Sequence, residues 1–223
     1  MYGNMTRIAV EPARAAKESP SFAGTGMSME CIERNGVMFE MLADTVWTTK
    51  PLDISAWLAK YLKARYHMND PDIMWSHLLP AWLYLNSSVF HFNGQLVKAL
   101  LEERPTLPAD RMWKPPSYLP ERVPAALELL LDAPANGLVI QGPFRQDVVD
   151  ITRQMLVDVF SDLVVLCKSS AAIREIKGGD RHGLSEIMAK MLELFDDLVS
   201  FVCFFDNQKL KWGFVLGRSS GKR

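Results

Sequence analysis

One stretch of this 223-residue chain, Gly24-Thr25-Gly26-Met27-Ser28-Met29-Glu30, decides how its fold is interpreted. Together with Phe22 and Ala23 it predicts a short strand, from about Phe22 to Met27, that delivers a carboxylate to the end of a sheet just before a helix. Glycines inside a strand usually allow a neighbouring backbone to come close. Carboxylates at the C-terminal ends of strands carry the chemistry of barrel enzymes. We therefore expect Glu30 to point into an open cleft, and the alternative is a first-turn glutamate favoured by the helix dipole.

The rest of the chain carries helical periodicity, with proline and glycine at the breaks. We expect helices over Thr6–Lys17, Ile32–Thr48, Glu121–Leu131 and Leu184–Phe205. Two more helices should follow the caps Asp53, with its end at Tyr66, and Asp70, with Pro71 in the first position. Phe144–Lys177 should form one long helix or two stacked ones. Pro80 is expected to kink the helix that contains it. The span from Pro51 to Leu216 should contain no sheet.

The predicted fold class is mainly α, with a short strand region at residues 1–50 and a helical domain at residues 51–223. A lone strand cannot stand as a sheet. The N-terminal region is therefore expected to be a piece of a larger domain.

Composition excludes several classes of function. With 25 basic against 26 acidic residues, the chain has no basic footprint for nucleic acid. No window approaches the roughly 20 apolar residues of a membrane span, and the first 20 residues do not resemble a signal peptide. Neither the three cysteines nor the four histidines show a metal-ligand spacing, so we expect no metal and no cofactor.

The run of residues 21–47 resembles the segment around the catalytic nucleophile in glycoside hydrolase family 89, the α-N-acetylglucosaminidases. That family carries Val-Gly-x-Gly-Met-x-x-Glu-Gly-Ile-x-x-Asn, followed by a helix and an aromatic residue. The matching positions here are Gly24, Gly26, Met27, Glu30, Ile32, Asn35, Phe39, Met41 and Trp47. Cys31 stands where the family has glycine.

Further matches follow in the family's order along the chain. They are Met1-Tyr2-Gly3, Pro12, Ala13, Ala15, Asp53, Ala56, Trp57, Leu58, Arg65, Tyr66, Trp75, Leu78, Leu79, Tyr84, residues 104–107, Met112, Trp113 and residues 147–154. The resemblance implies an internal fragment that covers the end of a (β/α)8 catalytic barrel and part of the C-terminal helical domain.

The resemblance also implies a function. Glu30 would be the nucleophile of a retaining, two-carboxylate hydrolysis of terminal α-linked N-acetylglucosamine in heparan-sulfate-type glycans. The glycan would be the partner of the full-length enzyme, which is expected to be lysosomal or secreted. The acid/base glutamate should lie on a barrel loop outside this sequence, so the chain alone is expected to be inactive.

Other carboxylates and aromatics have simpler interpretations. Glu33 is best explained as a first-turn helix residue, and Glu40 and Asp44 as a solvated helix face, so none is assigned as the acid. Trp113 and Trp212 could stack on sugars, although core packing is the favoured role. The competing hypothesis for the whole chain is a non-catalytic helical interaction module or pseudoenzyme, whose exposed apolar surface would bind a partner. The sequence does not fix an oligomeric state.

Overall fold

The computed structural model describes residues 3–28, 36–91, 119–136, 138, 142–177, 185–194 and 196–197. Within these ranges every regular element is helical, and an isolated bridge pairs Asn4 with His91. The elements are α1 (Met5–Glu18), α2 (Gly36–Thr45), α3 (Ile54–Tyr66), α4 (Pro71–Ile73), a π-helical turn (Met74–Leu78), α5 (Leu79–Asn86), α6 (Arg122–Asp132), a 3₁₀ turn (Ala133–Asn136) and α7 (Gly142–Lys177). The prediction of a mainly α fold is confirmed.

Side-chain caps fix where three helices begin. Asp53 accepts a hydrogen bond from the Ala56 amide at 3.0 Å, and Asp70 accepts one from the Asp72 amide at 2.8 Å. Each carboxylate thereby satisfies an amide that has no partner within its helix. Asn4 caps α1 in the same way through the amide of Arg7. The predicted starts of α3 and α4 are therefore confirmed.

The hydrogen-bond register of the helix changes just before Pro80, the residue at which a kink was predicted. Proline has no amide hydrogen for the carbonyl one turn earlier. The chain forms the π-helical turn just before it, in which the Leu79 amide donates to the carbonyl of Met74. The helix continues beyond Pro80 as α5.

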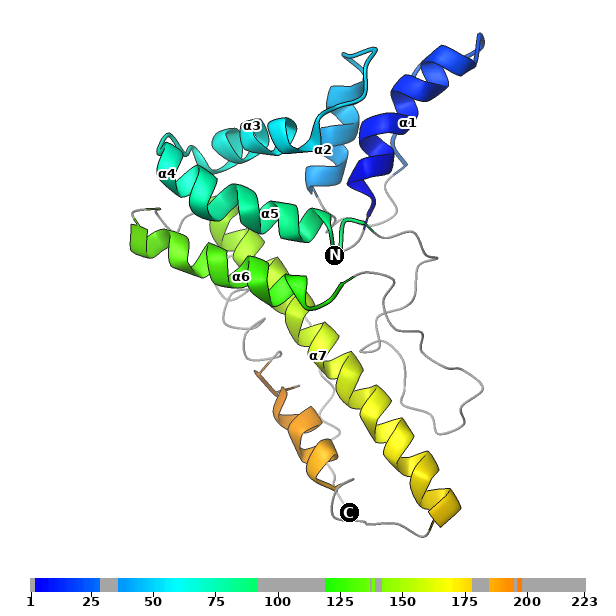
Figure 1. The fold of residues 1–223 in the computed structure, drawn as a ribbon, viewed down its shortest axis with the longest axis vertical. Helices are drawn as coiled ribbons and strands as arrows, with labels where there is room; N and C mark the ends of the chain where they lie inside the picture. The colour runs from blue at the N-terminus through cyan, green and yellow to red at the C-terminus, as the bar shows by residue number, and fades with distance from the viewer. Residues whose placement is uncertain are drawn as a thin grey trace, which may run out of the picture.

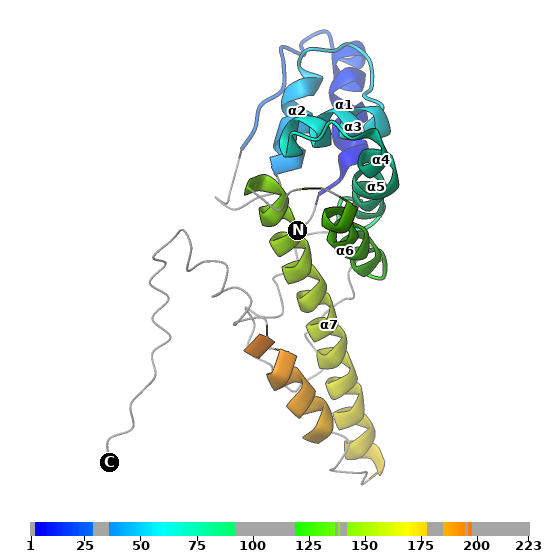
Figure 2. The same ribbon diagram turned by 90° about the vertical axis from the view of Figure 1, so that its left-hand side faces the viewer.

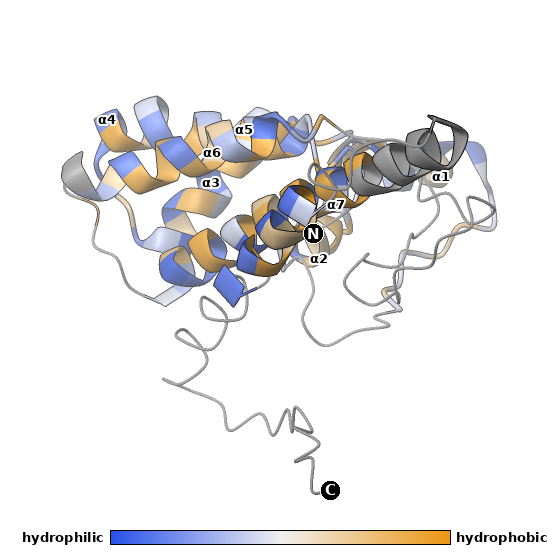
Figure 3. Cartoon of the chain, turned by 90° about the horizontal axis from the view of Figure 1, so that it is seen from below, coloured by the Kyte–Doolittle hydropathy of each residue, from blue (hydrophilic) through white to orange (hydrophobic). Residues whose placement is uncertain are grey.

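Residues 1–50 and the helices that follow share one hydrophobic core. The side chains of Met5 on α1, Met41 on α2, Leu58 on α3 and Leu85 on α5 are completely buried in one cluster. In Figure 1, α1, α2 and α3 gather at one end of the molecule, above α5 and α6. The helices around this cluster carry both apolar and polar residues (Figure 3), and their buried apolar side chains make up the core.

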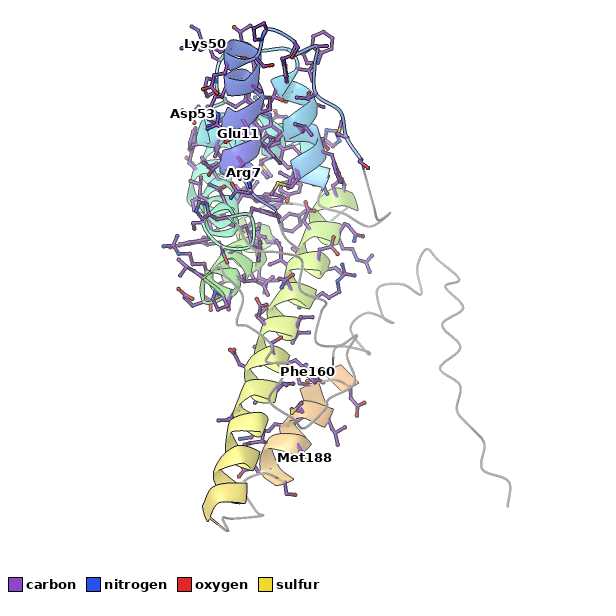
Figure 4. All side chains as sticks on the ribbon, turned by 90° about the vertical axis from the view of Figure 1, so that its right-hand side faces the viewer. Arg7, Glu11, Lys50, Asp53, Phe160 and Met188 are labelled. Carbon is purple, nitrogen blue, oxygen red and sulfur yellow. The ribbon has the colours of Figure 1, made fainter. Side chains whose placement is uncertain are left out.

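Backbone hydrogen bonds add to this packing. The Met5 amide donates to the carbonyl of Phe90 at 2.9 Å, and the Leu52 amide donates to that of Ala9 at 3.0 Å. The second bond joins α1 to the segment leading into α3, where Lys50 and Asp53 are labelled in Figure 4. The N-terminal region is thus bonded to the helical region at the start of α1 and again one turn further along it, at Ala9.

The helix α7 is one continuous element of 36 residues, which at 1.5 Å per residue is about 54 Å long. Its first turns pack on α3 and α6, and its remainder extends away from the core (Figures 1 and 2). Residues 185–194 and 196–197 are helical and lie beside this extension in both views. Of the two forms predicted for Phe144–Lys177, the single long helix is correct.

The strand predicted over Phe22–Met27 does not form. Residues 22–28 are neither helical nor paired in a ladder. Gly24 does have a positive φ of 154°, but a Cβ at Gly24 or Gly26 would meet no heavy atom within 4 Å. Within the described part of the chain, no backbone makes the close approach inferred from these glycines, and no segment there offers the main-chain groups a ladder to join.

Candidate functional site

The segment that carries the predicted nucleophile leads directly into α2. Glu30 and Glu33 lie outside the described residues, and α2 begins at Gly36. Val37, Met38 and Met41 on its inner face are buried in the shared core. This anchors α2 and leaves its opposite side for polar residues.

The polar side of α2 forms one wall of a cleft of about 460 Å³. The other walls come from α3 and the start of α7. The lining residues are Glu40, Asp44, Trp57, Lys60, Tyr61, Ala64, Arg65 and Pro143. The cleft thus combines two carboxylates, two cations and two aromatic rings, and it joins the N-terminal region to the helical region.

Glu40 and Asp44 are largely exposed to solvent, as predicted for a solvated helix face. Asp44 also has a structural partner, because its Oδ2 accepts a hydrogen bond from Trp57 Nε1 at 2.7 Å. The Trp57 ring stacks on Tyr61 with centroids 5.0 Å apart and planes 15° apart. Asp44 therefore holds the aromatic wall of the cleft against α2.

Beneath this wall a buried network joins α3 to α7. Arg65 Nε donates to Asp147 Oδ2 at 2.6 Å, and Arg65 Nη2 donates to Asp147 Oδ1 at 2.7 Å. The Tyr66 hydroxyl donates to Asp147 Oδ2 at 2.7 Å and accepts from Trp82 Nε1 at 3.2 Å. The Arg65 guanidinium also lies over the Tyr61 ring, 5.7 Å from its centroid. The carboxylate thus receives three charge-assisted hydrogen bonds.

Burial has the largest effect on the pKa values of Asp147 and Tyr66, and the hydrogen bond to Asp147 has the largest effect on that of Arg65. Desolvation raises the pKa of Asp147, although the hydrogen bonds from Arg65 and Tyr66 act in the opposite direction. The hydrogen bond to Asp147 raises the pKa of Arg65, so the guanidinium stays charged. Burial also raises the pKa of Tyr66 well above its ordinary value and keeps its hydroxyl a donor. Because its carboxylate accepts hydrogen bonds from three donor groups, Asp147 links α3 to α7.

Other residues singled out by sequence are distributed as follows. Met38 and Met41 are core residues, whereas Met27 is exposed. Trp113 and Trp212 lie outside the described residues. In the described part of the chain, no group of three His, Cys, Asp or Glu side chains could hold a metal ion. None of the helices described there has the length and apolar content to cross a bilayer.

Sequence reasoning missed the roles of Arg65, Tyr66 and Asp147. All three were noted as family matches, but nothing local connects residues 82 positions apart. The sequence carries no clear signal for this network, because Asp147 stands among other polar residues of α7 and only packing makes it need a partner.

Comparisons with known proteins agree on one family. Residues 57–210 match "Alpha-N-acetylglucosaminidase (NAGLU) C-terminal domain", and residues 1–49 match "Alpha-N-acetylglucosaminidase (NAGLU) tim-barrel domain". The Homo sapiens protein "Alpha-N-acetylglucosaminidase" is 28% identical over 196 residues, covering 85% of this chain and 25% of that relative. The chain therefore spans about a quarter of the length of this curated relative.

Two solved structures share the fold. One is a "Family 89 Glycoside Hydrolase" from Clostridium perfringens in complex with 2-acetamido-1,2-dideoxynojirmycin, with a TM-score of 0.71 and 18% identity over 88% of this chain and 22% of that chain. The other, from the same organism and in complex with its substrate GlcNAc-alpha-1,4-galactose, has the same TM-score, identity and coverage. At this identity, the likeness supports the arrangement of helices.

Proposed function

Because the chain belongs to the alpha-N-acetylglucosaminidase family, we propose that it supplies the nucleophile segment and part of the C-terminal helical domain of an enzyme that hydrolyses terminal α-linked N-acetylglucosamine. The observation that carries this proposal is the order of the two matches, with the barrel description on residues 1–49 and the C-terminal description on residues 57–210. We place the boundary between the two parts near Pro51, in the loop between α2 and α3. Heparan-sulfate-type glycans are the proposed substrates.

Glu30 is the proposed nucleophile. In a retaining reaction its carboxylate attacks the anomeric carbon, a second carboxylic acid protonates the leaving oxygen, and water then releases the sugar from the glycosyl-enzyme. The two carboxyl groups must lie about 5–5.5 Å apart. Support for Glu30 comes from its motif and from its place six residues before α2, which is anchored in the core by Met38 and Met41.

The test uses the full-length enzyme and an aryl α-N-acetylglucosaminide. Glu30→Gln should abolish release of the aryl group while the thermal unfolding midpoint stays unchanged. Glu33→Gln is the matched control, three residues away, and should retain turnover. In a retaining reaction, NMR should show the α-anomer of N-acetylglucosamine as the first product. Full activity of Glu30→Gln would contradict the role of Glu30 as nucleophile. A β-anomer as the first product would contradict the retaining mechanism.

The 223-residue chain by itself is proposed to be inactive on the same substrate. No acid is assigned in this sequence, and general acid catalysis typically contributes about 10²–10⁴-fold. Robust turnover by the purified chain would contradict this. The family resemblance also leads us to place the complete enzyme in the lysosome or outside the cell, which fractionation of expressing cells would check.

A further inference from the structure

A second groove, of about 290 Å³, lies between α3 and the segment that leads through α4 into the π-helical turn. It is lined by Ala59, Lys60, Lys63, Met68, Asn69, Asp70, Pro71, Met74 and Trp75, and we call it the Trp75 groove. Its floor is apolar, because Met68 and Met74 are buried there. The exposed side chains of Lys60, Lys63 and Asn69 surround that floor.

Trp75 presents its ring to solvent from a fixed backbone. Its side chain is 62% exposed, whereas its neighbours Met74 and Leu78 are buried in the core. The π-helical turn is closed by the hydrogen bond from the Leu79 amide to the Met74 carbonyl, and Pro80 excludes the normal helical register. Such turns occur frequently at functional sites. A large exposed indole held in this way is typical of a binding surface.

The charge beside this ring is positive. Lys60 and Lys63 stand three residues apart on α3, and in the described part of the chain neither forms an ion pair. The nearby carboxylate of Asp70 accepts hydrogen bonds from the amides of Asp72 at 2.8 Å and Ile73 at 3.3 Å. Asp70 thus caps α4, and two lysines against this one carboxylate still leave the lining of the groove with a positive formal charge.

We infer that the Trp75 groove binds an anionic sugar residue of a glycan chain, in addition to the sugar that Glu30 is proposed to attack. A pyranose ring has a face of C–H groups that packs on an indole, and a sulfate or carboxylate on the same ring pairs with the ammonium groups of Lys60 and Lys63. A concave, largely apolar floor with a few polar groups on its rim suits such a ligand. The identification of the ligand as a glycan rests on the proposed function.

The experiment titrates the ¹⁵N-labelled 223-residue chain with a heparin-derived tetrasaccharide. The indole N–H signal of Trp75 is assigned by its absence in Trp75→Phe. We expect this signal to shift saturably, and Trp75→Ala to weaken binding at least about tenfold. Lys63→Ala should weaken binding several-fold and reduce its salt dependence, while Trp75→Phe should retain most of the affinity. Neutral chitotetraose should bind at least about tenfold more weakly than the heparin fragment.

Trp47→Ala is the matched control, because Trp47 is 87% exposed but lines neither this groove nor the cleft beside α2. It should leave binding unchanged. Equal affinity of Trp75→Ala and the unaltered chain, or equal affinity for the two oligosaccharides, would overturn the inference. Hydrolysis of the small aryl substrate by the full-length enzyme does not involve this groove, so Trp75→Ala should leave it unchanged. Loss of groove binding and loss of the Glu30 reaction are thus measured separately.

Discussion

Arg65 on α3 donates two hydrogen bonds to the carboxylate of Asp147 on α7, at 2.6 and 2.7 Å, and so joins two helices that are distant in sequence. The Arg65 side chain is 22% exposed and that of Asp147 is 11% exposed. Arg65 also lines the cleft that contains Glu40 and Asp44. Loss of the Arg65–Asp147 pair would therefore alter the position of α7 relative to the cleft.

Asp147→Asn should lower the free energy of unfolding by about 2–3 kcal/mol. The amide fills the same volume but leaves the Arg65 guanidinium without its counter-charge. Breaking a fully buried pair costs about 3–5 kcal/mol, and the residual exposure of Arg65 reduces this figure. The measurement is urea unfolding of the 223-residue chain at pH 7.

The control for that change is Asp150→Asn, the same substitution one turn later on α7. Asp150 pairs with Arg153 at 3.1 Å, but these side chains are 29% and 41% exposed. The control should change the free energy of unfolding by at most about 1 kcal/mol. Similar losses in both variants would show that the Arg65–Asp147 pair contributes no more to the free energy of unfolding than the more exposed Asp150–Arg153 pair.

Stability should fall as pH rises above about 10, where tyrosines of the unfolded chain begin to ionise. Burial raises the pKa of Tyr61 and Tyr66, so both keep their protons in the folded chain. Above the unfolded pKa the folded state binds more protons than the unfolded state, and each tyrosine then reduces stability by about 1.4 kcal/mol per pH unit.

Removing one of these hydroxyls tests the origin of the alkaline loss. Tyr66→Phe should roughly halve the part of the pH slope due to the two tyrosines, measured by urea unfolding between about pH 9 and 11. Tyr84→Phe serves as the control, since Tyr84 is 41% exposed on α5. An identical slope in Tyr66→Phe and the unaltered chain would rule out this explanation.

Gly3→Ala should destabilise the chain by about 1–3 kcal/mol. Gly3 has a φ of +149°, and a Cβ there would lie 2.8 Å from Met38 Cε and 2.9 Å from Met38 Sδ. Both the backbone conformation and the packing against α2 therefore oppose a side chain. Gly26→Ala is the control, because a Cβ at that position would meet nothing within 4 Å. Thermal unfolding should separate the two variants, and equal midpoints would contradict the argument.

His67→Gly should stabilise the chain by about 0.5–1 kcal/mol. His67 ends α3 in the left-handed conformation, with φ 50° and ψ 36°, which glycine adopts without steric cost. Ala64→Gly, inside the same helix, should instead destabilise by about 1 kcal/mol. Opposite shifts of the urea midpoint are expected for the two glycines. A loss of stability in His67→Gly would mean that the imidazole contributes more than the strain costs.

Local chemistry made much of the secondary structure predictable. The caps Asp53 and Asp70 act within a few residues of their own positions, and the structure places both as expected. The irregularity near Pro80 is equally local, although it takes the form of a π-helical turn. The strand over Phe22–Met27 failed for the opposite reason, because a strand is completed by hydrogen bonds to another segment. Glu30 lies outside the described residues, and its proposed role depends on the family motif.

The sequence by itself determined the helical class, the start of α3 and the family, because these depend on periodicity, on side chains near a helix end and on an ordered series of motifs. Only the tertiary structure decided that residues 1–50 share a core with the later helices, that Arg65 meets Asp147, and that Trp75 stands beside Lys60 and Lys63. The physical reason is the distance along the chain over which each interaction acts. Capping and periodicity act over one or two turns, whereas a buried ion pair or a groove forms only when packing brings distant helices together.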